Sequence, residues 1–275
     1  MKHVRERLGQ HFLKDQKALA RIVTSLAISK NDTIVEIGPG HGELTEHILK
    51  AGPKKVIAIE KDSALVSSIQ YLVSSNDDLE IINGDALKIL PTVSKTYHLS
   101  PLTYKLVGNI PYYITGKLLR TIGDLEDKPS VVVLTIQKEV AERLSAKPPK
   151  MNLLAASVQF WGDPEIVRTI SRHAFRPQPK VESAIIRIAL HEKALIAPNS
   201  AMGINQRSQE NSDRYYKFIK ILFKQPRKTV ANNLKDGSDY TRQEVEEFLK
   251  SHNIEPTLRP QNLDIDTINI LSQSF

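Results

Sequence analysis

Short apolar runs alternate with helical segments over residues 16–190, and this alternation restricts the fold more than any other feature of the chain. The strand-like runs are Thr33–Ile37, Lys55–Glu60, Leu79–Asn83, Tyr104–Asn109 and Val131–Ile136. Strands separated by helices need crossover connections, which produce a parallel sheet covered by helices on both faces. The sequence therefore predicts an α/β protein built on a parallel sheet.

Helical spacing fits the segments between these runs. Leu19, Ile22, Val23 and Leu26 recur at intervals of three and four residues, which predicts a helix over residues 16–29 with Asp15 as its N-cap. Similar spacing occurs at Glu43–Lys50, Ser63–Val73 and Lys138–Ser145. Two later apolar runs, Ile166–Ile170 and Ala184–Leu190, are predicted to form an antiparallel hairpin at the edge of the sheet.

The pattern changes after Leu190. Residues 191–212 are polar and lack a clear period, so we expect a linker or long loop there. Only helical patterns follow, around residues 215–222, 245–249 and 265–271. We therefore expect one domain over residues 1–190, and a linker with a small all-helical domain over residues 191–275.

Composition excludes several classes of protein. The chain has 275 residues, of which 40% are hydrophobic and 25% charged, as in globular proteins. It contains no cysteine, which excludes disulfides, thiolate zinc sites and a cysteine nucleophile. The eight histidines show no metal-ligand spacing, and we expect no catalytic metal. No apolar run reaches the length of a membrane span, and the polar N-terminal residues contain no signal sequence, so we expect a cytoplasmic protein.

The charge distribution points to a polyanionic partner. The net charge is +7, and much of the excess is concentrated in three stretches. Residues 1–30 carry seven basic and two acidic side chains, residues 213–237 also carry seven and two, and residues 138–180 carry eight and four. Each stretch alone could be a solvated helix face. Together they favour nucleic acid over a membrane surface.

A glycine-rich turn, Gly38-Pro39-Gly40-His41-Gly42, follows the first predicted strand. Such a turn lets backbone N–H groups approach a ligand, although it can also be purely structural. The spacing differs from the Gly-x-Gly-x-x-Gly of dinucleotide sites, and no phosphate-binding loop with Gly-Lys-Ser or Gly-Lys-Thr occurs.

Acidic residues follow the next two strands. Glu60 ends the second strand, 18 residues past Gly42, where a carboxylate can accept hydrogen bonds from both ribose hydroxyls. Asp85 follows the third strand and can accept a hydrogen bond from an adenine amino group. A ligand with adenine and ribose but no phosphates fits S-adenosylmethionine, with a nicotinamide dinucleotide as the alternative.

The fourth strand ends in Asn109-Ile110-Pro111-Tyr112-Tyr113, which suits methylation of a conjugated amine. The Asn109 side-chain oxygen and the Ile110 carbonyl could each accept one N–H, which would turn the nitrogen lone pair toward the methyl group. Tyr112 offers a face on which a planar base can stack. The same residues could also form an ordinary turn at the end of a strand.

Together these residues resemble the ribosomal RNA adenine N6-dimethyltransferase family over nearly the whole chain. The resemblance rests on Leu8–Leu13, Glu36–Gly40, Glu60-Lys61-Asp62, Gly84-Asp85-Ala86, Asn109–Tyr113, Gln137–Arg143, Phe175–Ser183, Phe223–Lys228 and Arg259-Pro260. The pairing of Asn-Ile-Pro-Tyr-Tyr with Phe-x-Pro-x-Pro-Lys-Val-x-Ser is highly specific, whereas the glycine turn is common to many methyltransferases.

The resemblance implies a class I, Rossmann-like methyltransferase domain with a small all-α C-terminal domain. It also implies dimethylation of two adjacent adenosines near the 3′ end of small-subunit rRNA, in the immature small subunit, by a cytoplasmic monomer. The implied cofactor contacts are His11, Leu13, Gly38, Glu60, Asp85 and Asn109. The implied catalytic residues are Asn109, Pro111, Tyr112 and Phe175.

His11 and Phe175 each allow two interpretations. The family usually has Asn where this chain has His11, so that contact is expected to survive in altered form. Phe175 is expected to face Tyr112 across a flipped adenine, although it could instead be a core aromatic. The alternatives to the implied function are methylation of large-subunit rRNA, as in macrolide resistance, and a non-catalytic ribosome-assembly factor.

Overall fold

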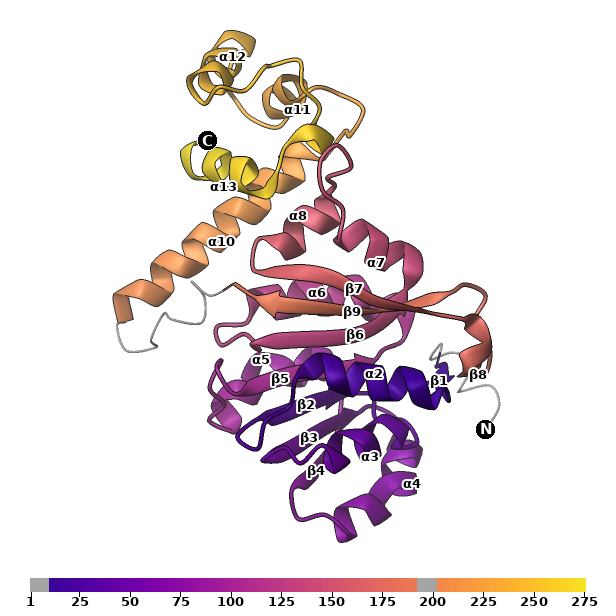
Figure 1. Ribbon diagram of the computed structural model, residues 1–275. Coiled ribbons are helices and arrows are strands. Elements are labelled where there is room, and N and C mark those ends of the chain that lie inside the picture. Colours follow the sequence, from indigo (N-terminus) through magenta and orange to yellow (C-terminus); the bar gives the residue numbers. More distant parts are fainter. Residues whose placement is uncertain (1–9, 192–201) are drawn as a thin grey trace. The chain divides into compact units, whose positions relative to one another are not determined.

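The computed structural model describes residues 10–191 and 202–275, and its centre is a seven-stranded sheet (Figure 1). The strand order is β4-β3-β2-β5-β6-β9-β7. The strands are β2 (Thr33–Ile37), β3 (Lys55–Glu60), β4 (Leu79–Asn83), β5 (Tyr104–Asn109), β6 (Val131–Gln137), β7 (Gly162–Ile170) and β9 (Ser183–Leu190). Strands β2 to β6 pair in parallel, and β9 runs antiparallel to both β6 and β7. The predicted parallel sheet and the antiparallel pairing of β7 with β9 are thus confirmed.

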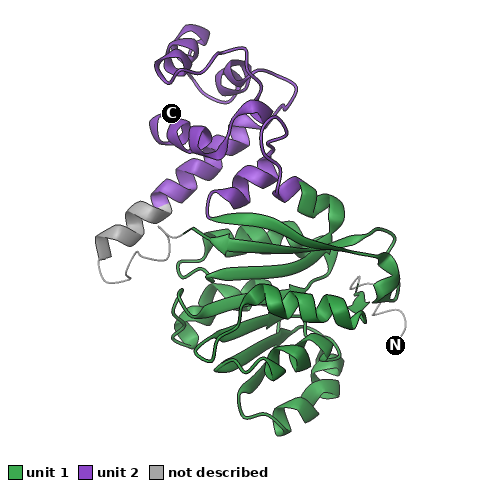
Figure 2. Ribbon diagram, in the orientation of Figure 1, with its two compact units in different colours: residues 1–142, 162–196 green, residues 143–161, 197–275 purple. Residues whose placement is uncertain are grey.

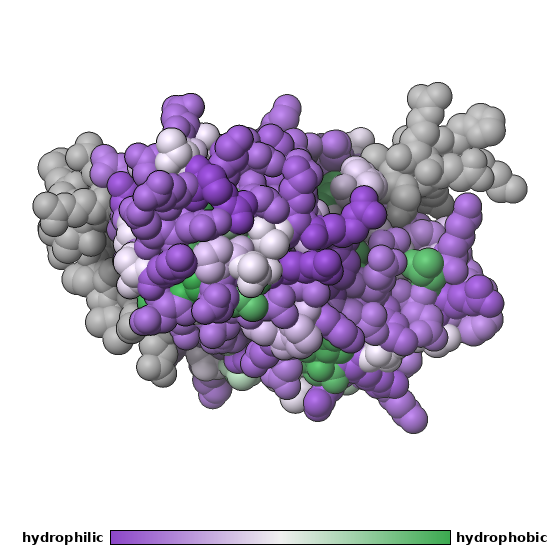
Figure 3. Space-filling model, turned by 90° about the horizontal axis from the view of Figure 1, so that it is seen from above, coloured by the Kyte–Doolittle hydropathy of each residue, from purple (hydrophilic) through white to green (hydrophobic). Residues whose placement is uncertain are grey.

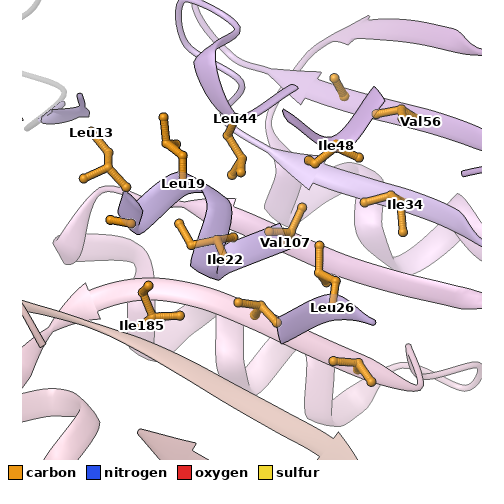
Figure 4. Packing of buried hydrophobic residues seen from close by; sticks show 14 of the residues in the cluster. Leu13, Leu19, Ile22, Leu26, Ile34, Leu44, Ile48, Val56, Val107 and Ile185 are labelled. Atoms are coloured by element: carbon orange, nitrogen blue, oxygen red, sulfur yellow. The ribbon is translucent and has the colours of Figure 1, made fainter. Parts of the chain in front are cut away.

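Helices cover both faces of this sheet (Figure 1). Helices α2 (Gln16–Leu26), α3 (Glu43–Lys50) and α4 (Ser63–Ser74) contribute to one apolar cluster with the strands. Leu19, Ile22 and Leu26 of α2 belong to this cluster, as do Ile34 of β2 and Ile185 of β9 (Figure 4). Helices α5 (Ala86–Thr96) and α6 (Thr115–Asp124) pack against each other, and α7 (Lys138–Leu144) follows β6 directly.

Local capping sets the limits of the first helix. The side chain of Asp15 accepts hydrogen bonds from the backbone N–H groups of Lys17 and Ala18, so the predicted N-cap is confirmed. The helix ends at Leu26 rather than near residue 29, because Ala27 adopts a left-handed conformation with φ of 48°.

A separate two-stranded ribbon joins the start of the described chain to a distant segment. Strand β1 (Phe12–Leu13) pairs antiparallel with β8 (Phe175–Arg176), and the Lys14 N–H donates to the Ala174 carbonyl at 2.8 Å. Nothing in the periodicity of two-residue strands predicts this pairing. The ribbon holds residues 10–14 against the segment that precedes β9.

The chain forms two compact units, residues 1–142 with 162–196 and residues 143–161 with 197–275 (Figure 2). The second unit contains α8 (Leu153–Gln159), α10 (Met202–Leu222), α11 (Val230–Asp236), α12 (Arg242–Ser251) and α13 (Ile265–Ser274). These helices share a core of their own, which includes Tyr215, Leu222, Val230, Leu249 and Ile268.

Two details of the predicted domain organisation differ from the structure. Helix α10 begins at Met202, within the segment 191–212 that was expected to be a loop, because the polar composition of this stretch conceals a helical period. Residues 143–161 were expected in the first domain, yet Met151 and Ala155 belong to the core of the second unit. The Tyr215 hydroxyl donates to the Ala156 carbonyl at 2.9 Å within that unit. Residues 192–201 of the expected linker lie outside the described residues.

The central strand β2 contains a fully buried carboxyl group. Glu36 is 0% exposed, and one of its oxygens accepts a hydrogen bond from the Thr45 hydroxyl at 2.7 Å. The other oxygen, Oε1, has no hydrogen-bond partner. Burial raises the pKa of Glu36 to about 8; the Thr45 hydrogen bond opposes this shift, and the nearby Glu60 and Glu43 add to it. At neutral pH this side chain is therefore mostly protonated.

We expect Glu36 to make folding stability depend on pH. Its pKa is higher in the folded state than the ordinary value of 4.5, so the folded protein retains a proton that the unfolded chain has lost. This contribution to stability is complete below about pH 4.5 and is lost as the pH rises through about 8. Glu36→Gln, which keeps the size but does not titrate, should lose less stability across this range. Urea unfolding at about pH 5.5, 7 and 8.5 measures the difference. Parallel stability curves for the two proteins would contradict the prediction.

Candidate active site

A cavity of about 340 Å³ lies at the carboxyl edge of the parallel strands. This is the edge at which open α/β sheets bind ligands, and the volume lies within the range of small-molecule sites. All six predicted cofactor residues line the cavity, namely His11, Leu13, Gly38, Glu60, Asp85 and Asn109. Parallel pairing brings them together from the ends of β2, β3, β4 and β5 and from β1.

The glycine turn forms one wall because its backbone adopts conformations that other residues avoid. Gly38, Gly40 and Gly42 have φ values of 68°, 61° and 90°, all in the left-handed region. A Cβ on Gly40 would also come within 2.9 Å of the Phe12 ring. The ring of Phe12 in turn lies 4.5 Å from the ring of His41, measured between centroids. The turn and the residues of β1 therefore fit together only with glycine at position 40.

Glu60 is held at the cavity by two backbone hydrogen bonds. Its Oε2 accepts from the Gly40 N–H at 3.2 Å, and its Oε1 accepts from the Asp62 N–H at 2.9 Å. Burial raises the pKa of this carboxyl, while the hydrogen bonds from Asp62 and Gly40 oppose the shift. Each carboxylate oxygen has a second lone pair, so Glu60 can still accept hydrogen bonds from two neighbouring hydroxyl groups.

Asp85 follows β4 and is the N-cap of α5. Its Oδ1 accepts from the Leu87 N–H at 3.0 Å, and its Oδ2 accepts from the Lys61 ammonium at 3.0 Å. The Lys61 hydrogen bond is the main reason that the pKa of Asp85 is lowered. The carboxylate is therefore ionised at neutral pH and available as an acceptor at the wall of the cavity.

Asn109 ends β5, and its amide is oriented by the first described residues. Its Nδ2 donates to the His11 carbonyl at 2.8 Å. A backbone carbonyl can only accept, so the atom that faces it must be the amide nitrogen, and the Asn109 oxygen remains as an acceptor. Pro111 also lines the cavity, two residues further along the chain.

Tyr112 is half-buried beside the cavity, although it is not among the residues that line it. Its hydroxyl forms a hydrogen bond of 2.6 Å with the Ser183 hydroxyl, and its ring centroid lies 5.7 Å from that of His11. Burial raises the pKa of Tyr112, and the Ser183 hydrogen bond only partly opposes this. The phenol is thus neutral at physiological pH.

The structure corrects the expectation for Phe175. Its side chain is 0% exposed and belongs to the apolar cluster that also contains Leu13 and Leu19. A ring enclosed in this way presents no face to a ligand, so Phe175 is a core residue in this conformation. Its pairing with Leu13 through β1 and β8 explains why the segment 175–183 stays close to the cavity even so.

Sequence reasoning missed several lining residues, among them Gln10, Phe12, Lys61, Tyr113 and Lys117. Gln10, Lys61 and Tyr113 are direct neighbours of predicted residues, so their position in the chain was the available signal. The Gln10 Oε1 is buried without a hydrogen-bond partner. It is an acceptor at the cavity wall that a donor group of a ligand, such as an α-ammonium, would satisfy.

The residues present fit S-adenosylmethionine. The cofactor's donors are the two ribose hydroxyls, the adenine amino group and the α-ammonium, and the cavity offers Glu60, Asp85 and Gln10 as acceptors. In the described parts of the chain, no group of three or more His, Asp or Glu side chains could hold a metal ion.

The second unit presents basic side chains to solvent. Lys217, Lys220, Lys224 and Arg227 are exposed, whereas Lys228 forms an ion pair of 3.0 Å with Asp236. The face seen in Figure 3 is mostly hydrophilic, with its hydrophobic residues in small separate patches. Among the described helices, none is long and apolar enough to cross a membrane. The part of the basic stretch that falls on residues 1–9 lies outside the described residues.

Known proteins resemble this chain over nearly its full length. The family model "Ribosomal RNA adenine dimethylase" matches residues 1–275. A ribosomal RNA small subunit methyltransferase A from Dehalococcoides mccartyi is 35% identical over 267 residues, covering 97% of this chain and 87% of the relative. The protein of the same name from Clostridioides difficile is 34% identical and covers 96% of this chain and 88% of the relative.

Solved structures share the fold. A dimethyladenosine transferase from Plasmodium falciparum superposes with a TM-score of 0.77 at 26% identity, covering 96% of this chain and 97% of the other. The 23S rRNA methyltransferase ErmE superposes with a TM-score of 0.70 at 22% identity, covering 95% and 98%. These similarities confirm the Rossmann-like methyltransferase fold with a helical C-terminal region. The chain belongs to the ribosomal RNA adenine dimethylase family.

Proposed function

We propose that this chain transfers methyl groups to the N6 amino groups of two adjacent adenosines near the 3′ end of small-subunit rRNA, during small-subunit biogenesis. The observation that carries the proposal is the Asn109 amide. Its nitrogen is bound to the His11 carbonyl, which leaves its oxygen as an acceptor at a cavity that also contains Glu60 and Asp85. The near full-length relatives named as small-subunit methyltransferases support the choice of substrate.

S-adenosylmethionine, the methyl donor of this family, supplies an electrophilic methyl group on a sulfonium with a good leaving group. We assign Glu60 to the ribose hydroxyls, Asp85 to the adenine amino group and Gln10 to the α-ammonium of this cofactor. His11, Leu13 and Gly38 complete the wall of the same cavity. Each assignment pairs a donor of the cofactor with an acceptor of the protein, and an acid at the end of the second strand is the usual partner of the ribose.

The chain's own residues prepare the target amine. The lone pair of an exocyclic adenine amine is delocalised into the ring, so the N–H groups must be turned before nitrogen can attack. The Asn109 oxygen and the Ile110 carbonyl would each accept one N–H, and both hydrogen bonds strengthen as the nitrogen gains positive character. Tyr112 would hold the flipped ring by stacking, and Pro111 shapes the turn between them.

No strong general base is required at this site. The proton on nitrogen becomes acidic only after the C–N bond has formed, so water can remove it. The raised pKa of Tyr112 and its hydrogen bond to Ser183 also argue against a phenolate base. Catalysis then depends on positioning and on hydrogen bonds to the developing cation.

We assign RNA backbone binding to the basic residues of the second unit, which modifies the expected RNA-binding domain at 191–275 to residues 143–161 with 197–275. We also propose that the protein acts as a monomer. A protein that acts on the immature small subunit would work in the cytoplasm.

Two alternatives remain as outcomes of experiment. A large-subunit rRNA methyltransferase would share the fold of ErmE, and an assembly factor without activity would share the binding surfaces. Incubation of undermodified small and large subunits with labelled cofactor, followed by mapping of modified adenosines, separates the three. Label in the small subunit at two adjacent adenosines supports the proposal. Label only in the large subunit, or none, would overturn it.

Cofactor binding should depend on Glu60. We expect Glu60→Ala to weaken S-adenosylmethionine binding by about 1–3 kcal/mol, the scale of hydrogen bonds to a charged group. Glu60→Gln keeps one acceptor oxygen and should lose less. Isothermal titration calorimetry measures both variants, with thermal unfolding as the control for folding. Unchanged affinity in Glu60→Ala, together with tight binding of a nicotinamide dinucleotide, would contradict the assignment.

Methyl transfer should separate the roles of Asn109 and Tyr112. We expect Asn109→Ala to abolish turnover while cofactor and RNA still bind, because the amine loses its aligning acceptor. Tyr112→Ala should lose a stacking contact of about 1–3 kcal/mol, whereas Tyr112→Phe keeps the ring face and should stay largely active. Single-turnover methylation of small subunits is the measurement. A Phe variant as inactive as the Ala variant would instead identify the hydroxyl as a base, and normal turnover by Asn109→Ala would refute the mechanism.

We expect RNA affinity to fall as salt is added, because exposed basic residues of α10 and of the turn after it would bind RNA phosphates. Because Lys228 is paired with Asp236, we expect neutralisation of Lys224 and Arg227 to reduce the salt dependence more than that of Lys228 alone. Each lost phosphate contact should lower the slope of log K against log salt by about 0.7–0.9. The double variant Lys50→Gln, Lys54→Gln, near the amino end of β3, is the matched control. A slope equal to that of wild type would mean that Lys224 and Arg227 are solvated charges only.

A further inference from the structure

His11 contacts two segments that are far from it in the sequence, residues 109–112 and Pro177. Its ring nitrogen Nδ1 lies 2.8 Å from the Pro177 carbonyl, which can only accept, so Nδ1 carries the hydrogen and donates it. Its backbone carbonyl accepts from Asn109 Nδ2 at 2.8 Å. Its ring centroid lies 5.7 Å from that of Tyr112, with 31° between the ring planes. One residue thus touches both groups assigned to the target base and the turn beyond β8.

The turn that His11 holds leads back to Tyr112. Residues 175–183 begin at β8, which pairs with β1, and end at Ser183, the first residue of β9. The Ser183 hydroxyl is hydrogen-bonded to the Tyr112 hydroxyl at 2.6 Å, and Ser183 itself is 0% exposed. The contacts therefore form a closed circuit from His11 to Pro177, along the chain to Ser183, and through Tyr112 back to His11.

This circuit constrains Tyr112 at both ends of its side chain. The buried Ser183 fixes the hydroxyl, and the imidazole lies against the ring. The Nδ1–H bond to Pro177 is the hydrogen bond described for the ring, so its loss would leave the imidazole held by packing alone. A less fixed imidazole would let Tyr112 shift, and small displacements at a reacting centre reduce rates strongly.

We propose that His11 is a positioning residue, which uses its Nδ1–H bond to Pro177 to hold Tyr112 and Asn109 in place for the target adenine. The proposal rests on the proposed function, and it assigns the imidazole a different task from that of a cofactor ligand. The Nδ1–H already donates to the Pro177 carbonyl, and the His11 backbone carbonyl already accepts from Asn109. The side chain should therefore affect the rate of methyl transfer more than the affinity for cofactor or RNA.

The chemistry of the δ position suggests a matched pair of variants. Asparagine places an N–H on the atom bonded to Cγ, as histidine does at Nδ1, and can donate to the Pro177 carbonyl. Leucine has nearly the same branched shape and no donor. His11→Asn and His11→Leu thus share a branched side-chain skeleton and differ in the hydrogen bond, and neither introduces a charge. His173→Leu makes the same change at an exposed histidine near the same turn and serves as the control.

The experiment uses the full chain and undermodified small subunits. Single-turnover rate constants for methylation are measured for all variants, with S-adenosylmethionine affinity from calorimetry and RNA affinity from a binding titration. We expect His11→Leu to lower the rate constant about tenfold while both affinities change less than threefold, on the scale of one lost hydrogen bond. His11→Asn and His173→Leu should stay within about threefold of wild type. His11→Ala removes the donor without apolar bulk and replaces His11→Leu if thermal unfolding shows that the latter does not fold.

Each other outcome decides against the proposal. Equal rate constants for wild type and the donor-free variants would show that the hydrogen bond positions nothing. Weakened cofactor binding with an unchanged rate constant at saturation would make His11 a cofactor ligand instead. An Asn variant as slow as the Leu variant would show that the donor is not the functional feature. If wild type labels no small-subunit adenosine, the proposed function fails and the inference with it, whereas active wild type with an equally active His11→Leu overturns the inference alone.

Discussion

Parallel pairing of the central strands is the constraint on which the site depends. When strands run in the same direction, their carboxyl ends meet at one edge, and the side chains that follow them converge. The register places Ile37 beside both Ile59 and Gly108, and Glu60 beside Asn83. The glycine turn, Glu60, Asp85 and Asn109 therefore surround one cavity although 71 residues separate the first of them, Gly38, from Asn109. The sheet brings their acceptor groups to one cavity, where together they suit the hydroxyl and amino groups of a nucleoside.

The second requirement is the ribbon of β1 and β8, which lies outside the main sheet. It brings residues 10–13 to the wall of the cavity. There the Gln10 Oε1 is an acceptor without a hydrogen-bond partner, and the His11 carbonyl orients Asn109. The ribbon also joins the cofactor wall to the segment that ends at Ser183. The sheet thus provides most of the acceptors, and the ribbon adds Gln10 and orients Asn109.

Sequence patterns predicted the parts of the structure that are governed by local periodicity. The bounds of β2, β3, β4 and β5 agree with the predicted runs, because buried parallel strands are short continuous apolar segments that turns interrupt clearly. Helix α5 contains Pro91 and was not singled out, and the polar start of α10 was expected to be a loop. A proline inside the first helix and a polar composition at the start of the second obscure the helical pattern.

The candidate site was predictable at the level of strand ends but not of orientation. Glu60 and Asn109 are the last residues of strands, so topology alone places them. Phe175 lies in the two-residue strand β8 and Tyr112 in a single 3-10 turn, where the direction of a ring depends on partners distant in the sequence. Phe175 turns into the core against Leu13 and its neighbours, and Tyr112 turns toward Ser183. Neither pairing leaves a periodic signal.

The discontinuity of the second unit has a consequence for how the protein is made. Residues 143–161 leave the ribosome well before residues 197–275, although both supply the core around Tyr215. During synthesis the apolar side chains of this first segment stay exposed until α10 and α13 have emerged, and they include Met151, Ala155 and Ala156. The sheet, by contrast, can close once β9 is complete. We therefore expect folding of the nascent chain to end with the helical unit, and a truncation directly after residue 190 to leave apolar surface of α8 exposed.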